Sequence, residues 1–416
     1  MKNFITILKD IWKIEELKNK ILLTLGLIAV YRFMAGVPLP GIDPLQLSAL
    51  KEGTSSGLLG LLNAFTGGAF SRASIMALGI MPYISASIVV QLMGIAVPYL
   101  QKLQKDGESG RKKITQITRW LTILITMVQG PTYIAAIQNT FGLPPEAFLV
   151  TGPTFWISSM ILLTAGTIFA MWLGERITDK GVGNGISLLI TVGIIANFPA
   201  AFLQEFVAKT TNAGAGGLMM ILIEIIVWFV VILLSVLLVT AVRKIAVQYA
   251  RRTVAGNVQN VAGSRDYIPL KLNAAGVMPI IFAQAIMFLP VALAQRFPII
   301  AGLQDMNGLW YNVVFALLII IFSYFYTAIT IPTNKMAEDL KRSGGFIPGI
   351  RPGKDTADKL DSILSKITFP GSLFLAMLSI LPAIVAQFGV QQSWAMFYGG
   401  TSLIIMVGVA IDTLQQ

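Results

Sequence analysis

The 416-residue chain contains no cysteine and no histidine, and only 12% of its residues are charged. The missing cysteines exclude disulfides and thiol nucleophiles, and the missing histidines remove the usual proton shuttle and the commonest metal ligand. Enzymatic chemistry would have to depend on carboxylates, lysine or serine, yet nearly all charged residues fall between long apolar runs. We therefore expect a protein that is not an enzyme and that uses no cofactor or metal ion.

Apolar residues are what the chain has in excess. They make up 55% of the sequence, and the mean hydropathy of +0.74 is far above that of an average soluble protein. Because a helix needs about 20 apolar residues to cross a bilayer, the runs predict a multi-pass, all-α membrane protein with ten transmembrane helices. The expected spans are Ile21–Val37, Ala73–Val97, Trp120–Ile137, Phe155–Leu173, Ile186–Phe202, Leu218–Val242, Ala274–Ala294, Trp310–Ile331, Phe369–Phe388 and Met396–Ile411.

Lysine and arginine are distributed unevenly between the two sides that these spans define. All but five of the 31 basic residues fall on the side that holds both chain ends; the exceptions are Arg32, Lys51, Arg72, Lys209 and Arg296. Since cytoplasmic loops carry the excess of Lys and Arg, both termini and the large loops are predicted to be cytoplasmic. The N-terminal arm, residues 1–20, is predicted to be an amphipathic helix at the membrane surface rather than a cleavable signal.

Two long basic cytoplasmic loops, residues 243–271 and 335–366, exceed what topology requires and are predicted to project as hairpins. One explanation of their charge is chain orientation or contact with anionic lipid headgroups. The alternative explanation is that the loops bind an acidic or nucleic-acid-bearing cytosolic partner. The segment GFIPGIRPGK favours docking, because its Pro and Gly residues stiffen a turn around Arg351 that a solvated loop does not need.

The apolar stretch of residues 57–93 is too long for one span and is interrupted at Gly67, Gly68, Ser71 and Arg72. A half-length apolar helix precedes the interruption. Irregular backbone and an arginine at membrane depth are tolerated only where protein or water surrounds them. The half-length helix therefore either occupies a cavity or belongs to an ordinary external loop.

Two pairs of short motifs recur five spans apart. GIMPYI (Gly79–Ile84) in the second span corresponds to GVMPII (Gly276–Ile281) in the seventh. GISLLI (Gly185–Ile190) in the fifth corresponds to GTSLII (Gly400–Ile405) in the tenth. Because halves of five spans have opposite orientations in the membrane, the motifs predict an inverted repeat with the functional path between its halves.

Each motif ends in an isoleucine near the middle of its span. In the second and fifth spans another isoleucine lies one helical turn away on the same side of the helix. A stripe of isoleucine usually forms ordinary core or lipid-facing surface. On repeat-related helices it predicts instead an apolar constriction that excludes ions by dewetting. Pro82 and Pro279 are expected to kink the helices beside it. The isoleucines are Ile80, Ile84, Ile190, Ile194, Ile281 and Ile405.

These residues carry a resemblance to the SecY/Sec61α family of protein translocation channels. It implies two inverted five-helix halves, residues 1–208 and 209–416, around a central hourglass pore with a half-length plug helix. The similar stretches are GGAFSRASIMALGIMPYISASIVVQL at the second span, ERITDKGVGNGISLLI leading into the fifth, IPLKLNAAGVMP at the seventh, GGFIPGIRPG in the fifth cytoplasmic loop and FYGGTSLIIMVGVAID in the tenth span.

The resemblance also implies the site residues. The six isoleucines would form a ring around the pore, and a plug of roughly residues 58–71 would close it from outside. A lateral gate would open between the second and third spans on one side and the seventh and eighth on the other. Its polar residues would be ordinary interhelical hydrogen-bonding groups, a tuned gating threshold, or both. The residues are Leu58, Leu61, Leu62, Phe65, Gly67 and Gly68 for the plug; Ser87, Gln129 and Asn273 for the gate; and Arg251, Arg252, Arg351 and Lys354 for docking of SecA or the ribosome.

By the same resemblance, the chain would be a passive protein-conducting channel in the plasma membrane of a bacterium. It would pass unfolded secretory polypeptides across the membrane and release transmembrane segments into the lipid bilayer through the lateral gate. Signal peptides and translocating polypeptides would be its substrates. The SecA ATPase or the ribosome would drive the movement, and SecE and SecG would be its small partner subunits.

Two other classes of function fit the sequence less well. A secondary transporter also uses inverted repeats, but it normally needs ionisable residues at mid-membrane. Glu224 is the only carboxylate deep in a predicted span. An intramembrane serine enzyme would need a base to activate Ser187 or Ser402, and the chain has no histidine to supply one.

Overall fold

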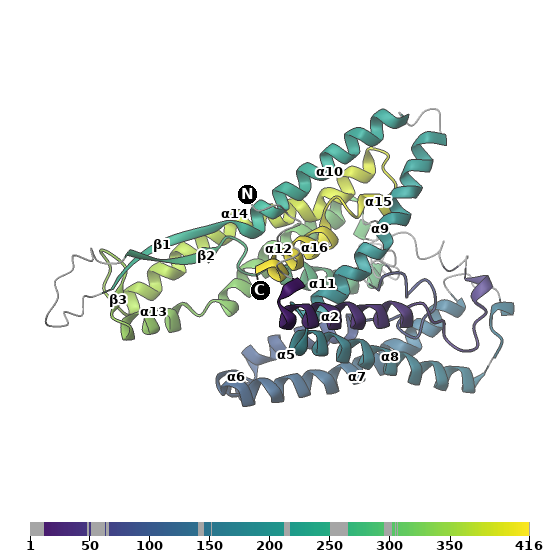
Figure 1. Cartoon of the computed structure of the whole chain (residues 1–416), viewed down its shortest axis with the longest axis horizontal. Helices are drawn as coiled ribbons and strands as arrows, with labels where there is room; N and C mark the ends of the chain where they lie inside the picture. Colours follow the sequence, from purple (N-terminus) through teal and green to yellow (C-terminus); the bar gives the residue numbers. More distant parts are fainter. Residues whose placement is uncertain are drawn as a thin grey trace. The chain divides into compact units, whose positions relative to one another are not determined.

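The computed structural model describes residues 12–47, 50, 63, 66–139, 145–150, 152–211, 217–249, 265–294, 302–303, 305 and 307–415. The chain forms two compact units (Figure 1). The first comprises Met1–Gly217, Gln391–Trp394 and Val409–Gln416, and the second comprises Leu218–Val390 and Ala395–Gly408. Most of the predicted N-terminal arm, residues 1–11, lies outside the described residues.

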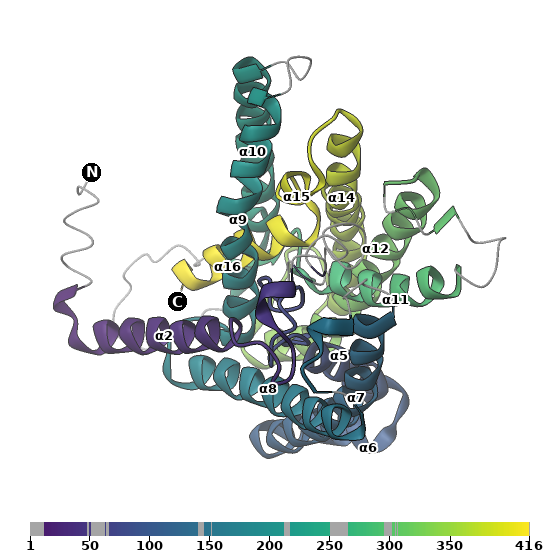
Figure 2. The ribbon, with the colours of Figure 1, turned by 90° about the vertical axis from the view of Figure 1, so that its right-hand side faces the viewer.

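The first unit is a bundle of helices. Within it α5 packs on α7, α7 on α8, α8 on α9, and α2 on α8 (Figure 2). A buried apolar cluster that includes Leu39, Phe70, Tyr133 and Leu163 forms its core. The elements are α2 (Glu15–Met34), η1 (Pro44–Gln46), α5 (Met81–Ala96), α6 (Pro98–Lys105), α7 (Gly107–Asn139), η2 (Pro145–Ala147), α8 (Pro153–Lys180) and α9 (Gly185–Thr211).

The second unit combines long helices with a small sheet. The helices are α10 (Gly217–Thr240), α11 (Met278–Ala294), α12 (Leu309–Thr330), α13 (Thr333–Arg342) and α14 (Lys354–Gln387); α15 (Gln392–Ala395) and α16 (Gly400–Gln415) contribute residues to both units. The sheet has the order β2-β1-β3 and is antiparallel throughout. Its strands are β1 (Val242–Tyr249), β2 (Arg265–Lys271) and β3 (Gly345–Phe346).

The two basic loops fold together into one structure, which we call the loop subdomain: β1, β2, β3, α13 and residues 354–367 of α14 (Figure 1). β1 and β2 form the predicted hairpin, with Val242 opposite Lys271 and Gln248 opposite Arg265. A common apolar core joins the sheet to both helices. Its buried members are Ile245, Val247, Leu270, Leu340, Ile347, Leu360, Leu364 and Ile367.

The predicted spans correspond to helices. In the described part of the chain, seven helical stretches are long and apolar enough to cross a membrane: Gly107–Gln138, Pro153–Lys180, Gly185–Thr211, Gly217–Thr240, Leu309–Arg342, Lys354–Gln387 and Gln392–Gln415. The first, second and seventh predicted spans fall on α2, α5 and α11, which are shorter or carry more charge. After α5 the chain bends by 102° into α6. Pro98 explains this bend, because proline forces the preceding Val97 into an extended conformation.

The second span differs from its prediction. The predicted span begins at Ala73, whereas α5 begins only at Met81. Ala73 (φ 46°) and Gly79 (φ 53°) have left-handed backbone conformations, which interrupt a helix. The buried backbone before α5 instead forms turns, in which Ala77 N–H donates to Ser74 (2.9 Å). The prediction of a continuous helix is therefore wrong over residues 73–80.

The four repeat motifs have related local structures. α5 and α11 each begin two residues after a left-handed glycine, Gly79 (φ 53°) and Gly276 (φ 63°). Gly185 and Gly400 are the first residues of α9 and α16. These matching starts support the internal repeat, while the division into inverted halves at residues 208 and 209 stays a prediction.

Pro82 and Pro279 lie in the first turns of α5 and α11. There the missing N–H of proline removes no helical hydrogen bond, and the fixed φ favours the start of a helix. The predicted kinks at these prolines are therefore wrong, and the prolines instead help to set where the two helices begin.

Candidate functional site

Residues 66–73, which we call the hinge segment, include the described end of the predicted plug (residues 66–71) and form turns rather than helix. The predicted hinge glycines, Gly67 (φ 64°) and Gly68 (φ 85°), are consecutive left-handed residues. Only glycine adopts this conformation at low cost, so the sequence itself favours a turn here. Every residue of the segment except Arg72 is buried. Leu58, Leu61, Leu62 and Phe65 lie outside the described residues.

Hydrogen bonds to backbone and side-chain groups outside the segment replace those that a helix would make here. The Asn63 carbonyl accepts from Gly68 N–H (2.9 Å), and its Oδ1 accepts from Ser71 N–H (3.0 Å). From α7, Tyr133 Oη donates to the Phe70 carbonyl (2.7 Å), and the two rings lie 4.8 Å apart. Because buried backbone groups need partners, these bonds fix the irregular path before α5.

Residues of α2 and α9 contact the hinge glycines. Arg32 Nη1 donates to the Gly67 carbonyl (3.0 Å). A Cβ on Gly67 would overlap the Arg32 guanidinium and lie 2.8 Å from Cα of Gly193, next to Ile194 on α9. The sequence prediction treated Arg32 only as a basic residue on the external side. An arginine inside a span needs a partner, and that signal was available in the sequence.

Replacing Gly67 by alanine is expected to destabilise the folded chain more than replacing Gly68. Both changes place an L-residue in a left-handed conformation, at a cost of roughly 1–2 kcal/mol each. Only the Gly67 substitution also puts a Cβ against backbone, 2.8 Å from Gly193 Cα, whereas the nearest atom to a Cβ on Gly68 is 3.6 Å away. Thermal unfolding of the purified variants checks this. Equal losses for Gly67→Ala and Gly68→Ala would contradict the close approach of the hinge to α9.

The six predicted ring isoleucines belong to four helices: Ile80 directly before α5, Ile84 on α5, Ile190 and Ile194 on α9, Ile281 on α11 and Ile405 on α16. Ile84 N–H donates to the Ile80 carbonyl (3.0 Å), which confirms that these two side chains lie one turn apart. Ile190 and Ile194 have the same spacing on α9. All six are buried except Ile281 on α11, which is half-buried. Ile281 and Ile405 belong to the second unit and the other four to the first, so the ring itself stays a prediction.

The three predicted gate residues have different surroundings. Ser87 on α5 is half-buried and accepts a hydrogen bond from Gln91 Nε2 (3.4 Å), while Gln129 on α7 is exposed. Asn273 lies in the turn before α11 and is 8% exposed. Within the described residues its Oδ1 has no hydrogen-bond partner, which is costly for a buried amide oxygen. A gate composed of all three stays a prediction.

The predicted docking residues differ in how far they are described. Arg351, in the turn between β3 and α14, and Lys354, the first residue of α14, are exposed. Arg251 and Arg252 lie outside the described residues. The turn predicted around Arg351 is present: its carbonyl accepts from Thr356 Oγ1 (2.8 Å), and Gly353 has a φ of 112°. The loop subdomain beneath holds this turn on a folded core.

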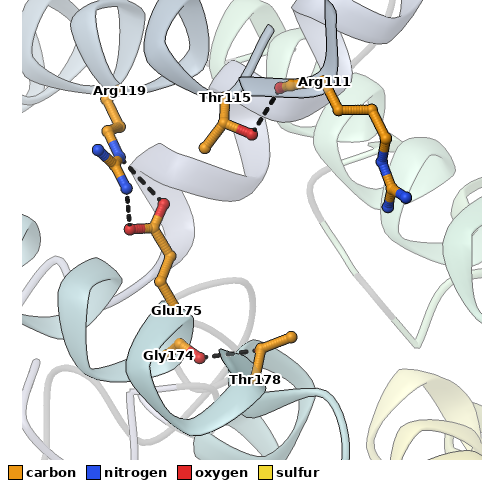
Figure 3. A network of polar contacts seen from close by, with 6 residues as sticks. All are labelled: Arg111, Thr115, Arg119, Gly174, Glu175 and Thr178. Atoms are coloured by element: carbon orange, nitrogen blue, oxygen red, sulfur yellow. Dashed lines mark hydrogen bonds and ion pairs between the residues drawn. The ribbon is translucent and has the colours of Figure 1, made fainter. Parts of the chain in front are cut away.

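The sequence did not single out an ion pair that joins α7 to α8. Arg119 Nε and Nη2 donate to the two carboxylate oxygens of Glu175 at 3.1 and 2.5 Å (Figure 3). At the end of α8, Thr178 Oγ1 accepts from Gly185 N–H (2.9 Å) and so connects α8 to the start of α9. The Arg119 side chain is 49% exposed, so we expect the pair to contribute about 1 kcal/mol or less.

Long apolar helices, an irregular buried segment before α5 and a folded loop subdomain together define a multi-pass, mainly helical membrane protein. A family model described as SecY matches residues 74–414. The chain belongs to the SecY family.

Curated relatives agree over almost the whole chain. The chain is 39% identical over 421 residues to the protein translocase subunit SecY of Streptomyces scabiei, covering 97% of this chain and 95% of the relative. The SecY of Helicobacter pylori (strain ATCC 700392 / 26695) is 39% identical over 408 residues, with the same coverage. That of Aquifex aeolicus (strain VF5) is 38% identical over 420 residues, covering 98% and 95%.

Solved structures share the fold. One, described as the structure of a protein-conducting channel, superposes with a TM-score of 0.63 at 20% identity, covering 100% of this chain and 96% of the other. Another, from work on the plug domain of the SecY protein, gives a TM-score of 0.68 at 20% identity and the same coverage. The predicted fold class, an all-α ten-helix membrane channel, is confirmed.

Proposed function

We propose that this chain is the channel-forming subunit of a protein translocase in the plasma membrane of a bacterium. It passes unfolded secretory polypeptides across the membrane and releases transmembrane segments into lipid through a lateral gate. The observation that carries the proposal is the identity of 38–39%, over nearly the full length, to bacterial relatives named protein translocase subunit SecY.

The seal of the resting channel has two parts. Six isoleucines form an apolar collar that excludes hydrated ions, because water leaves a narrow apolar constriction. Branched aliphatic side chains offer no hydrogen bonds, so they fit around an extended polypeptide without binding it. The plug closes the external side and moves about Gly67 and Gly68, a role supported by their left-handed conformations.

The lateral gate selects apolar segments. A segment that is stable in lipid also stabilises an open gate, since it replaces the contacts between the separating helices. Ser87, Gln129 and Asn273 set the threshold through hydrogen bonds between helices, each worth roughly 1 kcal/mol. The buried Asn273 Oδ1 has no hydrogen-bond partner among the described residues. This supports a role in which Asn273 accepts a hydrogen bond in one arrangement of the gate helices and not in another.

The channel performs no chemistry of its own, and its driving force comes from cytosolic partners. The SecA ATPase or the translating ribosome docks on the loop subdomain through Arg351 and Lys354, and through Arg251 and Arg252 of the other loop. The exposed basic side chains of Arg351 and Lys354 suit both an acidic protein surface and ribosomal RNA phosphates. SecE and SecG complete the membrane complex, and both termini are cytoplasmic.

Reconstitution tests the proposal. The chain is purified with SecE and SecG, placed in lipid vesicles and supplied with SecA, ATP and a secretory precursor. We expect the precursor to become protected from external protease only when ATP and a functional signal peptide are present. Vesicles with SecE and SecG alone are the control. Protection that does not require this chain would contradict the assignment.

A further inference from the structure

Arg32 makes a contact whose position is unusual. It lies near the end of α2, inside a predicted span, and is half-buried. A guanidinium at such a site needs partners within the protein. Its Nη1 donates to the carbonyl of Gly67, 35 residues further along the chain (3.0 Å). Arg32 thus connects α2 to Gly67, the first of the two hinge glycines.

Other carbonyls near the hinge glycines accept from different donors. The Gly68 carbonyl accepts from Ser71 Oγ (3.2 Å) within the segment, and the Phe70 carbonyl accepts from Tyr133 on α7 (2.7 Å). Arg32 therefore supplies the hydrogen bond that reaches the Gly67 carbonyl from outside the hinge segment. A hydrogen bond from a charged donor is about twice as strong as one between neutral groups.

Rotation about Gly67 and Gly68 is the movement that this contact opposes. Two consecutive glycines have access to more backbone conformations than any other residue pair. Contacts from outside the segment therefore help to determine their path: the Arg32 hydrogen bond, the close approach of Gly193 to Gly67, and the Asn63 carbonyl that accepts from Gly68 N–H. Losing the Arg32 bond removes one contact while leaving the bonds of Asn63 and Tyr133 in place.

We infer that Arg32 is a positioning residue for plug movement: its hydrogen bond to the Gly67 carbonyl latches the hinge segment and sets how readily the plug leaves the closed channel. This inference rests on the proposed function, which assigns the plug. The latch itself is a local property of the first unit and can be measured without reference to transport.

A cysteine reporter tests the latch, because the chain has no background thiols. Ala69, in the hinge segment, and Ala170, on α8, are both 0% exposed. Each is replaced by cysteine, alone and combined with Arg32→Met, in the reconstituted complex. We expect Arg32→Met to raise the rate of N-ethylmaleimide labelling at Ala69→Cys about tenfold or more, because loss of a charge-assisted bond favours local opening. The rate at Ala170→Cys is expected to stay unchanged.

Two further variants separate the latch from charge alone. Arg72→Met removes a second guanidinium that lies beside Gly68, about 3.7 Å from the position of a Cβ, without touching the bond to Gly67. We expect it to leave labelling at Ala69→Cys unchanged. Arg32→Lys keeps the charge and a donor, and is expected to give a smaller increase than Arg32→Met.

The outcomes are distinguishable. Unchanged labelling at Ala69→Cys in Arg32→Met would overturn the latch, and so would equal increases at Ala69→Cys and Ala170→Cys, which would indicate that Arg32 supports the whole unit. Ion conductance of the same vesicles is measured in parallel. In a channel that also carries serine at the six ring positions, where the plug alone limits the leak, faster labelling at Ala69→Cys with unchanged conductance would support the latch and contradict the assignment of a plug in the proposed function.

Discussion

Serine at all six ring positions is expected to turn a channel that excludes ions at rest into one that leaks them. The hydroxyl groups hydrate the constriction, so the barrier that dewetting creates falls. Each ~1.4 kcal/mol removed from this barrier raises the ion flux about tenfold. The change affects Ile80, Ile84, Ile190, Ile194, Ile281 and Ile405 together, and conductance across a planar bilayer or through vesicles measures it.

Valine at the same six positions is the matched control for this experiment. It removes one methylene per side chain but keeps a branched apolar surface, so the seal should hold. Translocation of a precursor, measured on the same vesicles, shows that each variant is folded. A serine variant that translocates normally and conducts no more ions than the parent channel would contradict the assignment of the six isoleucines to a pore ring.

Glutamate in place of Arg351 is expected to abolish most SecA-driven export while leaving entry of signal peptides into the gate largely intact. The substitution reverses the charge of an exposed side chain at a proposed docking turn. The turn itself should survive, because Thr356 Oγ1 donates to the backbone carbonyl of Arg351 rather than to its side chain. Export is measured by protease protection, and signal entry by crosslinking of a signal peptide to the gate.

Lys244→Glu provides the control for Arg351→Glu. Lys244 is exposed on β1 of the same loop subdomain, so the variant carries the same reversal of charge at a different place. We expect it to retain most of the export activity. Equal losses in the two variants would mean that the overall charge of the subdomain matters rather than the turn around Arg351, and normal export in Arg351→Glu would refute the docking role.

Apolar length and the positions of Gly and Pro were enough to predict the membrane helices and the turn at Arg351. They failed at the second span, where apolar residues continue through residues 73–80 although the backbone forms turns. Hydropathy indicates whether a segment is stable in an apolar environment, but it does not determine the backbone conformation of that segment. The left-handed conformation of Ala73 depends on tertiary contacts, such as Leu39 N–H donating to its carbonyl (2.8 Å), which the local sequence does not reveal.

Interactions between residues far apart in the sequence are the other features that the sequence did not predict. Arg119 and Glu175 lie 56 residues apart, and nothing in either segment indicates that α7 and α8 bring them together. The loop subdomain is different, because Ile245 and Val247 alternate along β1 and signal a strand with one buried face. That pattern is typical of a strand, but the apolar partners of the strand on α13 and α14 become apparent only from the folded chain.

The central claim, that polypeptides pass through a constriction formed by these isoleucines, is tested most directly by a disulfide. A precursor with one cysteine is halted during translocation through a channel with the single substitution Ile281→Cys, and Leu233→Cys on the exposed face of α10 is the control. The proposed function predicts a crosslink at residue 281 that requires SecA and ATP, and none at residue 233. A halted precursor that forms no crosslink at 281, or that crosslinks equally at 233, would contradict it.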